Sequence, residues 1–135
     1  MADESDLYLS KAVESLAGAE SEFANGRYNN AANRAYYACF QAAITALNRA
    51  GIHPSGARGE WGHDFVQSQF AGQLINRRKA YPAELRDTLL QSMRVRAQAD
   101  YKITGVSEAQ ASRALARART FVAPVVAYER GGTGR

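Results

Sequence analysis

The segment RVRAQADY, residues 94–101, contains two arginines and an aspartate near the end of a helix-forming stretch. Arg96 and Asp100 are four residues apart, so their guanidinium and carboxylate groups can meet on one helix face. Arginine is well suited to hold phosphate groups and to stack on nucleic-acid bases. The spacing therefore indicates either a structural ion pair or part of a site for an anionic ligand.

The helical periodicity of this stretch places the pair on the inward side. Leu85, Leu89 and Met93 form an apolar stripe. At about 100° per residue, Arg96 and Asp100 lie within roughly 20° of the centre of that stripe. Because burying one unpaired charge costs several kcal/mol, the two groups must pair, and they need further hydrogen-bond donors.

A second polar group lies on the expected helix 28–50, whose buried stripe contains Tyr36. Asn33 falls about 60° from Tyr36 on the helical wheel, where a bundle would normally have a leucine. We expect Asn33, Tyr36 and Tyr37 to complete the hydrogen bonding of the charged pair. The group is either a buried network that fixes the register of the bundle or a functional cleft against the expected helix 83–103.

Three other side chains are candidates near this group. Arg94 points to one side of its helix, and Tyr101 lies about 120° from the apolar stripe, so we expect a half-buried ring beside the pair. His63 lies in the first turn of the expected helix 61–79 and is the one imidazole near a helix that could serve as an acid or base. A histidine in a first turn is also commonly just a polar neighbour.

The elements that must position these groups are alanine-rich, helix-forming segments separated by glycine and proline. No stretch alternates with period two, so we expect no strands. The short links favour antiparallel neighbours and predict an all-α, four- to five-helix up-and-down antiparallel bundle. The domain should span residues 5–128, followed by a disordered tail, 129–135. The expected helices are 5–25, 28–50, 61–79, 83–103 and 107–128, the last capped by Ser107.

The composition of the 135-residue chain limits the class of protein. One cysteine cannot form an internal disulfide, and two histidines without a cysteine pair give no metal-site spacing. We therefore expect a reducing compartment, no metal and no cofactor. The start, MADESDLYLS, is acidic where a signal peptide would be basic, and no apolar run approaches about 18 residues. These features predict a cytoplasmic protein that does not contact a membrane.

The net charge of +4 is unevenly distributed along the chain. Residues 1–25 carry six acidic side chains against the single base Lys11, so sixteen bases and seven acids remain in the rest. Nearly all of these bases are arginines. This distribution indicates either a solvated basic surface or a surface that binds a nucleic acid or a nucleotide.

Two motifs together resemble the HEPN family, in particular a prokaryotic branch with RxYYAxF and RxxADY motifs. They are RAYYACF, which begins at Arg34, and RAQADY, which ends at Tyr101. The resemblance covers residues 5–127 and implies a helical bundle, usually a homodimer, often encoded beside a nucleotidyltransferase or in toxin–antitoxin and antiviral defence loci. It adds Arg34 to the binding candidates, although the helical wheel places this side chain away from the buried stripe.

Many HEPN proteins are metal-independent endoribonucleases in which a histidine follows an arginine by four to six residues. Counting from Arg94 or Arg96, this chain has no such histidine, and Asp100 stands nearby. An aspartate paired with arginine stays ionised and cannot exchange protons near neutral pH. The chain is then a module that binds RNA, a nucleotide or a partner nucleotidyltransferase through a polar groove between helices. The alternative is an RNA-cleaving toxin, in which Arg96 holds the scissile phosphate, Asn33 and Asp100 orient it, and His63 supplies the acid–base group.

Overall fold

The computed structural model describes residues 3–55 and 59–131, with side chains described as far as residue 128. Within these ranges helices are the only regular elements, which confirms the predicted all-α class, and each helix end lies within three residues of its predicted place when α3 and η1 are taken together. The last helix continues to Gly131, so the expected tail from residue 129 begins as helix, and residues 132–135 lie outside the described ranges. The elements are α1 (Glu4–Ala24), α2 (Tyr28–Arg49), α3 (His63–Gln69), the π-helix η1 (Phe70–Arg77), α4 (Leu85–Tyr101) and α5 (Glu108–Gly131).

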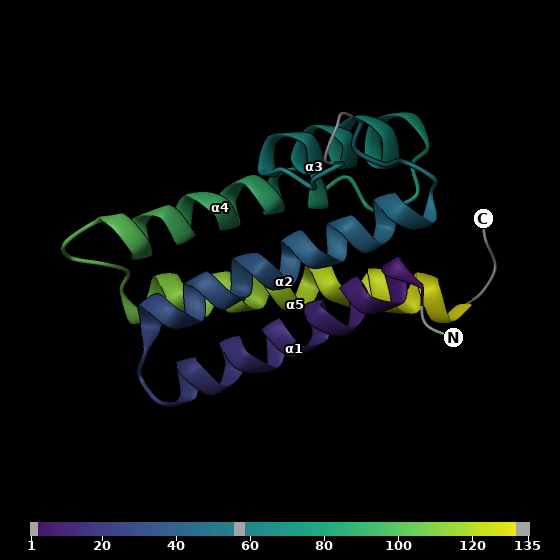
Figure 1. The fold of residues 1–135 in the computed structure, drawn as a ribbon. Coiled ribbons are helices and arrows are strands. Elements are labelled where there is room, and N and C mark those ends of the chain that lie inside the picture. The colour runs from purple at the N-terminus through teal and green to yellow at the C-terminus, as the bar shows by residue number, and fades with distance from the viewer. Residues whose placement is uncertain (1–2, 56–58, 132–135) are drawn as a thin grey trace.

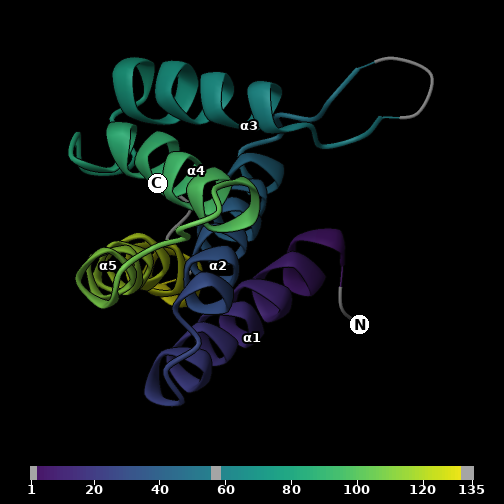
Figure 2. The same cartoon turned by 90° about the vertical axis from the view of Figure 1, so that its left-hand side faces the viewer.

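Helix α2 lies at the centre of the bundle and packs against α1, α4 and α5 (Figures 1 and 2). Successive long helices run in opposite directions, as the up-and-down prediction requires (Figure 1). Helix α3 and η1 cover the outer side near α4, at the end of the molecule where α2 finishes (Figure 2). No helix in the described part of the chain is long and apolar enough to cross a membrane.

The apolar stripes predicted from periodicity form the core. Tyr36 and Phe121 are among the largest fully buried side chains, with 1% and 0% of their surface exposed. Met93, at the end of the α4 stripe, is only partly buried and packs on the edge of this core. Leu85 and Leu89 of the predicted α4 stripe are buried, and other buried core side chains are Phe40, Ala43, Leu47, Val66, Phe70, Leu74, Leu115, Val122 and Val125.

The expected helix 61–79 differs from the observed one in its second half. After α3 ends at Gln69, the backbone continues as the π-helix η1. Val66, Phe70 and Leu74 are spaced by four residues, and the wider π turn, which closes hydrogen bonds five residues apart, keeps such a spacing on one face. A wheel drawn at 100° per residue gives the right buried face here but cannot distinguish the two helix types.

The turn between α4 and α5 is fastened to the start of α2. The side-chain oxygen of Asn29 accepts a hydrogen bond of 2.9 Å from the backbone N–H of Val106. Gly105 has a φ of +66°, and a Cβ there would lie 2.5 Å from that oxygen, so only glycine fits. The predicted cap at Ser107 is confirmed, because its hydroxyl accepts from the backbone N–H of Gln110 at 3.1 Å. These contacts hold the end of α4 beside the first turns of α2.

Candidate functional site between α2 and α4

Arg96 and Asp100 meet on α4 as the spacing predicts. Arg96 Nη1 donates to Asp100 Oδ2 at 3.3 Å, and the two side chains are 17% and 28% exposed. The pair therefore lies at the rim of the core and faces α2. Arg96 Nε is buried, and no group in the described part of the chain accepts its hydrogen.

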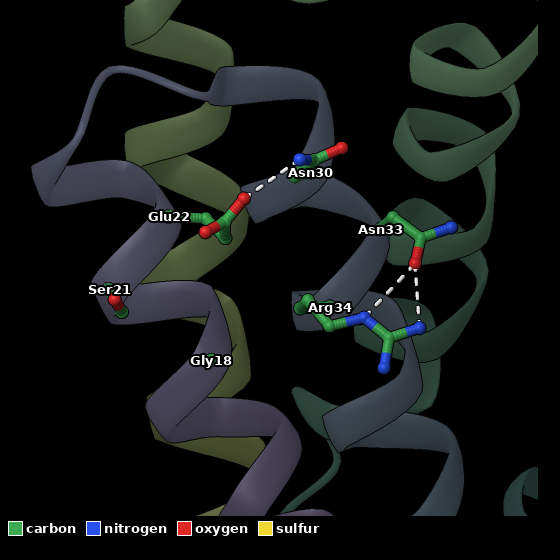
Figure 3. A pocket seen from close by; sticks show the side chains of 6 residues that line it. All are labelled: Gly18, Ser21, Glu22, Asn30, Asn33 and Arg34. Carbon is green, nitrogen blue, oxygen red and sulfur yellow. Dashed lines mark hydrogen bonds between the residues drawn. The ribbon is translucent and has the colours of Figure 1, made fainter.

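Asn33 connects this pair to α2. Its amide nitrogen lies 3.3 and 3.5 Å from the two carboxylate oxygens of Asp100. Its amide oxygen accepts two hydrogen bonds from Arg34, at 3.2 Å from Nε and 2.8 Å from Nη2 (Figure 3). The helical wheel placed Arg34 away from the buried stripe, and its side chain is indeed exposed, but it reaches back to join the network through Asn33.

The rings of two tyrosines on α2 lie against the guanidinium groups of Arg34 and Arg96. Arg96 Cζ lies 5.3 Å from the ring centroid of Tyr36 and 5.9 Å from that of Tyr37, and Arg34 Cζ lies 5.2 Å from that of Tyr37. These are distances at which a guanidinium is attracted to the face of a ring. The rings keep both arginines close to α2.

His63, the first residue of α3, completes the site from a third helix. Its Nδ1 is hydrogen-bonded to the hydroxyl of Tyr36, and its ring centroid lies 4.8 Å from that of Phe40. Burial lowers the pKa of His63, and the positive charge of Arg96 lowers it further, against the opposing effect of Asp64. The structure therefore brings His63 to the predicted residues. We call Asn33, Tyr36, Tyr37, His63, Arg96 and Asp100 the α2–α4 cluster.

The protonation states within the cluster follow from these contacts. Burial raises the pKa of Tyr36 although Arg96 opposes this, so its hydroxyl keeps its proton. The lowered pKa of His63 favours a neutral ring with one proton, on Nδ1 or on Nε2. With the proton on Nε2, Nδ1 accepts from the Tyr36 hydroxyl; with the proton on Nδ1, this nitrogen donates to Tyr36 and Nε2 is free to take up a proton.

Two predicted site residues lie apart from the cluster. Arg94 is exposed on the side of α4, as its position on the wheel predicts. Tyr101 was expected to be half-buried beside the charged pair, and that expectation is wrong, because 76% of its surface is exposed. It is the last residue of α4, and its position about 120° from the apolar stripe turns the ring away from the core.

Sequence reasoning missed a pocket on the other side of Asn33. It lies between α1 and α2 and is lined by Gly18, Ser21, Glu22, Asn30, Asn33 and Arg34 (Figure 3). The available signal was Gly18, a glycine inside a helix, which often marks a close approach of another group. A Cβ at this position would lie 3.7 Å from Arg34 Cδ.

Comparison with known proteins identifies the fold family. A search of curated proteins found no match to this chain. The family model of the HEPN domain matches residues 5–129, which include every residue of the α2–α4 cluster and all of the helices except the first residue of α1 and the last two of α5. The chain therefore belongs to the HEPN family.

Proposed function

We propose that this protein is an RNA-binding helical module of a prokaryotic toxin–antitoxin or antiviral defence system. In this proposal single-stranded RNA lies along the surface where α2 meets α4. The observation that carries the proposal is the α2–α4 cluster itself, in which polar and aromatic side chains from three helices form one connected network at the rim of the core.

The cost of the cluster to stability supports a role beyond packing. Leaving a buried N–H without an acceptor costs about 1–3 kcal/mol, and Arg96 Nε is such a group. Apolar residues of similar size would often be as stable as a buried ion pair. Polar networks that do not add to the stability of the core are expected at functional sites. We therefore infer that the α2–α4 cluster binds a ligand.

The chemistry of the exposed neighbours favours RNA. Arg34 and Arg94 are exposed on α2 and α4, the two helices that meet at the cluster, and can contact phosphates. Tyr37 is partly exposed beneath Arg34, and bases of single strands stack on aromatic rings and guanidinium planes. When it carries the ring proton, Nε2 of His63 adds a donor that suits a phosphate or carbonyl oxygen.

The test is the affinity for a labelled single-stranded RNA, measured by fluorescence anisotropy at about 50 and about 200 mM salt. Affinity should fall as salt rises, because each arginine–phosphate contact releases counterions. The variant Arg94→Gln should weaken binding and lower the salt dependence. The matched control is Arg86→Gln, which removes an exposed arginine near the other end of α4 and should bind like the wild type. Undetectable binding at low salt would remove the RNA proposal and favour a partner nucleotidyltransferase.

The proposed assembly is a homodimer, supported by membership of a family whose domains often dimerise. Two copies would bring two α2–α4 clusters into one assembly. Light scattering at tens of micromolar protein should give twice the monomer mass. A monomer at that concentration would leave each cluster to bind RNA alone.

A second candidate function is metal-independent RNA cleavage, which the position of His63 beside Tyr36 and Arg96 favours. With the ring proton on Nε2, His63 can assist a leaving group or hold a phosphate, and with the proton on Nδ1, its Nε2 can act as the base. Cleavage of RNA in the presence of a metal chelator, abolished by His63→Ala, would establish this activity. Intact RNA after long incubation with protein that binds it would support the binding function alone.

A further inference from the structure

A polar pocket of about 360 Å³ lies beside the α2–α4 cluster, between the second half of α1 and the first half of α2 (Figure 3). Asn33 belongs to both sites, with its amide nitrogen toward Asp100 and its oxygen toward Arg34. Every lining residue except Gly18 has a polar side chain. A strand held at the cluster could therefore extend one nucleotide into this pocket.

Arg34 presents a fixed cation to the pocket. Asn33 Oδ1 holds its Nε and Nη2, and the Tyr37 ring lies against the guanidinium. No group among the described residues accepts from Nη1, which leaves this nitrogen to donate to a ligand. Because the side chain is already ordered, a ligand does not have to bear the entropy cost of ordering it.

Glu22 presents a carboxylate to the same space. Its Oε1 accepts from Asn30 Nδ2 at 2.8 Å, and its Oε2 lies 3.6 Å from Nη1 of Arg27. A carboxylate has about four lone-pair sites, so both oxygens can accept another hydrogen bond. The pocket thus combines an acceptor pair on α1 with a donor on α2.

We propose that this pocket binds a guanine base, an inference that rests on the proposed RNA-binding function. Among the four RNA bases, guanine alone has two adjacent N–H donors, N1–H and the N2 amino group, on its Watson–Crick edge. These donors match the two oxygens of Glu22, and the neighbouring O6 and N7 acceptors match Arg34 Nη1. Uracil and cytosine each place an acceptor where one of the two donors is required, and adenine has an acceptor at N1.

The same chemistry could come from a base within an RNA strand or from a free guanine nucleotide. The experiment separates these sources with two pairs of ligands. One pair is a uridine decamer and the same decamer with one central guanosine. The other pair is free guanosine monophosphate and uridine monophosphate.

The wild type should bind the guanosine-containing decamer about tenfold more tightly than the uridine decamer, the size expected for one bidentate base contact. Glu22→Gln should remove this preference while leaving the affinity for the uridine decamer unchanged. The matched control Glu14→Gln removes an exposed carboxylate elsewhere on α1 and should keep the preference. A second variant, Gly18→Leu, should also remove the preference by filling the pocket, whereas Gly18→Ala, whose Cβ meets Arg34 at ordinary contact distance, should keep it.

The outcomes distinguish this inference from the proposed function. Equal affinity of the wild type for both decamers would overturn the guanine pocket and leave RNA binding in place. A preference that survives both Glu22→Gln and Gly18→Leu would place guanine recognition elsewhere. Failure to bind either decamer, together with Glu22-dependent binding of guanosine monophosphate over uridine monophosphate, would support the pocket as a nucleotide site and remove the RNA proposal. Failure to bind any of the four ligands would overturn both.

Discussion

The α2–α4 cluster and the apolar centre of the bundle are built from neighbouring turns of the same two helices, yet, among the described residues of these two regions, only the cluster contains an ion pair. In the centre, Cys39 Sγ of α2 lies 3.8 Å from Ser92 Oγ of α4. Burial raises the pKa of the Cys39 thiol to about 12, so it stays uncharged. One turn further along α4, Arg96 pairs with Asp100 at the rim. The charged pair therefore lies where the two helices reach solvent, whereas the thiol in the buried centre is uncharged.

Arg117 of α5 is an exception, because it is a basic residue whose Nε is buried in the centre of the bundle. Its Nε is buried without an acceptor among the described residues, like Arg96 Nε, but no acidic side chain contributes to its environment. Burial lowers the pKa of Arg117, and the neighbouring Arg113 lowers it further. The comparison teaches that a buried arginine nitrogen alone does not mark a site, and that the network around Arg96 is what separates the two regions.

The largest expected effect tests the centre. Phe121 is 0% exposed and packs against Phe70 with ring centroids 4.9 Å apart. Phe121→Ala should lower the free energy of unfolding by about 3–5 kcal/mol, because it leaves a cavity in a packed core. Urea unfolding followed by circular dichroism measures this loss. RNA affinity of the fraction that remains folded should be unchanged, and a specific loss of binding would contradict the division into two regions.

The next effect tests the cluster. Asp100→Ala should lower the free energy of unfolding by about 1–2 kcal/mol, because water can solvate part of the remaining Arg96 charge at the rim. RNA binding should be lost, since Arg96 and Asn33 lose the carboxylate that orders them. Urea unfolding and anisotropy on the same sample measure both quantities.

The control for this prediction replaces the whole pair. A double variant with Arg96→Leu and Asp100→Met should be nearly as stable as the wild type, because apolar residues often substitute for a buried pair without loss. It should not bind RNA. A double variant that is folded and binds RNA fully would show that the cluster is only structural.

A smaller effect of opposite sign is expected at Arg117. Arg117→Met should raise the free energy of unfolding by up to about 1 kcal/mol, because it removes an unsatisfied buried N–H and a like-charge neighbour of Arg113. Arg113→Met, at the exposed position one turn earlier, is the control and should change stability less. Thermal unfolding of the two variants compares them directly. A marked destabilisation by Arg117→Met would contradict this prediction and show that Arg117 stabilises the fold.

The sequence predicts the periodic features well and the irregular ones poorly. The seven- and eleven-residue steps from Leu89 place Arg96 and Asp100 on the inner face, and in the structure both side chains face α2, partly exposed at the rim of the core. The hydrogen bond between Tyr36 and His63 could not be predicted, because it depends on the path of the chain between α2 and α3. A helical wheel places Arg117 on the same face as the exposed Arg113, yet Arg117 is half-buried. A wheel describes one helix, whereas the burial of a long arginine depends on the neighbouring helices.

The smallest predicted effect concerns pH and the histidine of the cluster. The folded state holds the pKa of His63 below its ordinary value, mainly by burial. Below the unfolded pKa of about 6.5 the unfolded chain binds a proton that the folded chain does not, so stability should fall as pH drops toward the folded pKa and stay level above that range. One proton limits the slope to about 1.4 kcal/mol per pH unit. Urea unfolding between pH 7.5 and 5.5 should show this decrease in the wild type and a smaller one in His63→Asn, which cannot titrate. Equal decreases in both proteins would mean that His63 does not carry the effect and that burial does not hold its ring neutral.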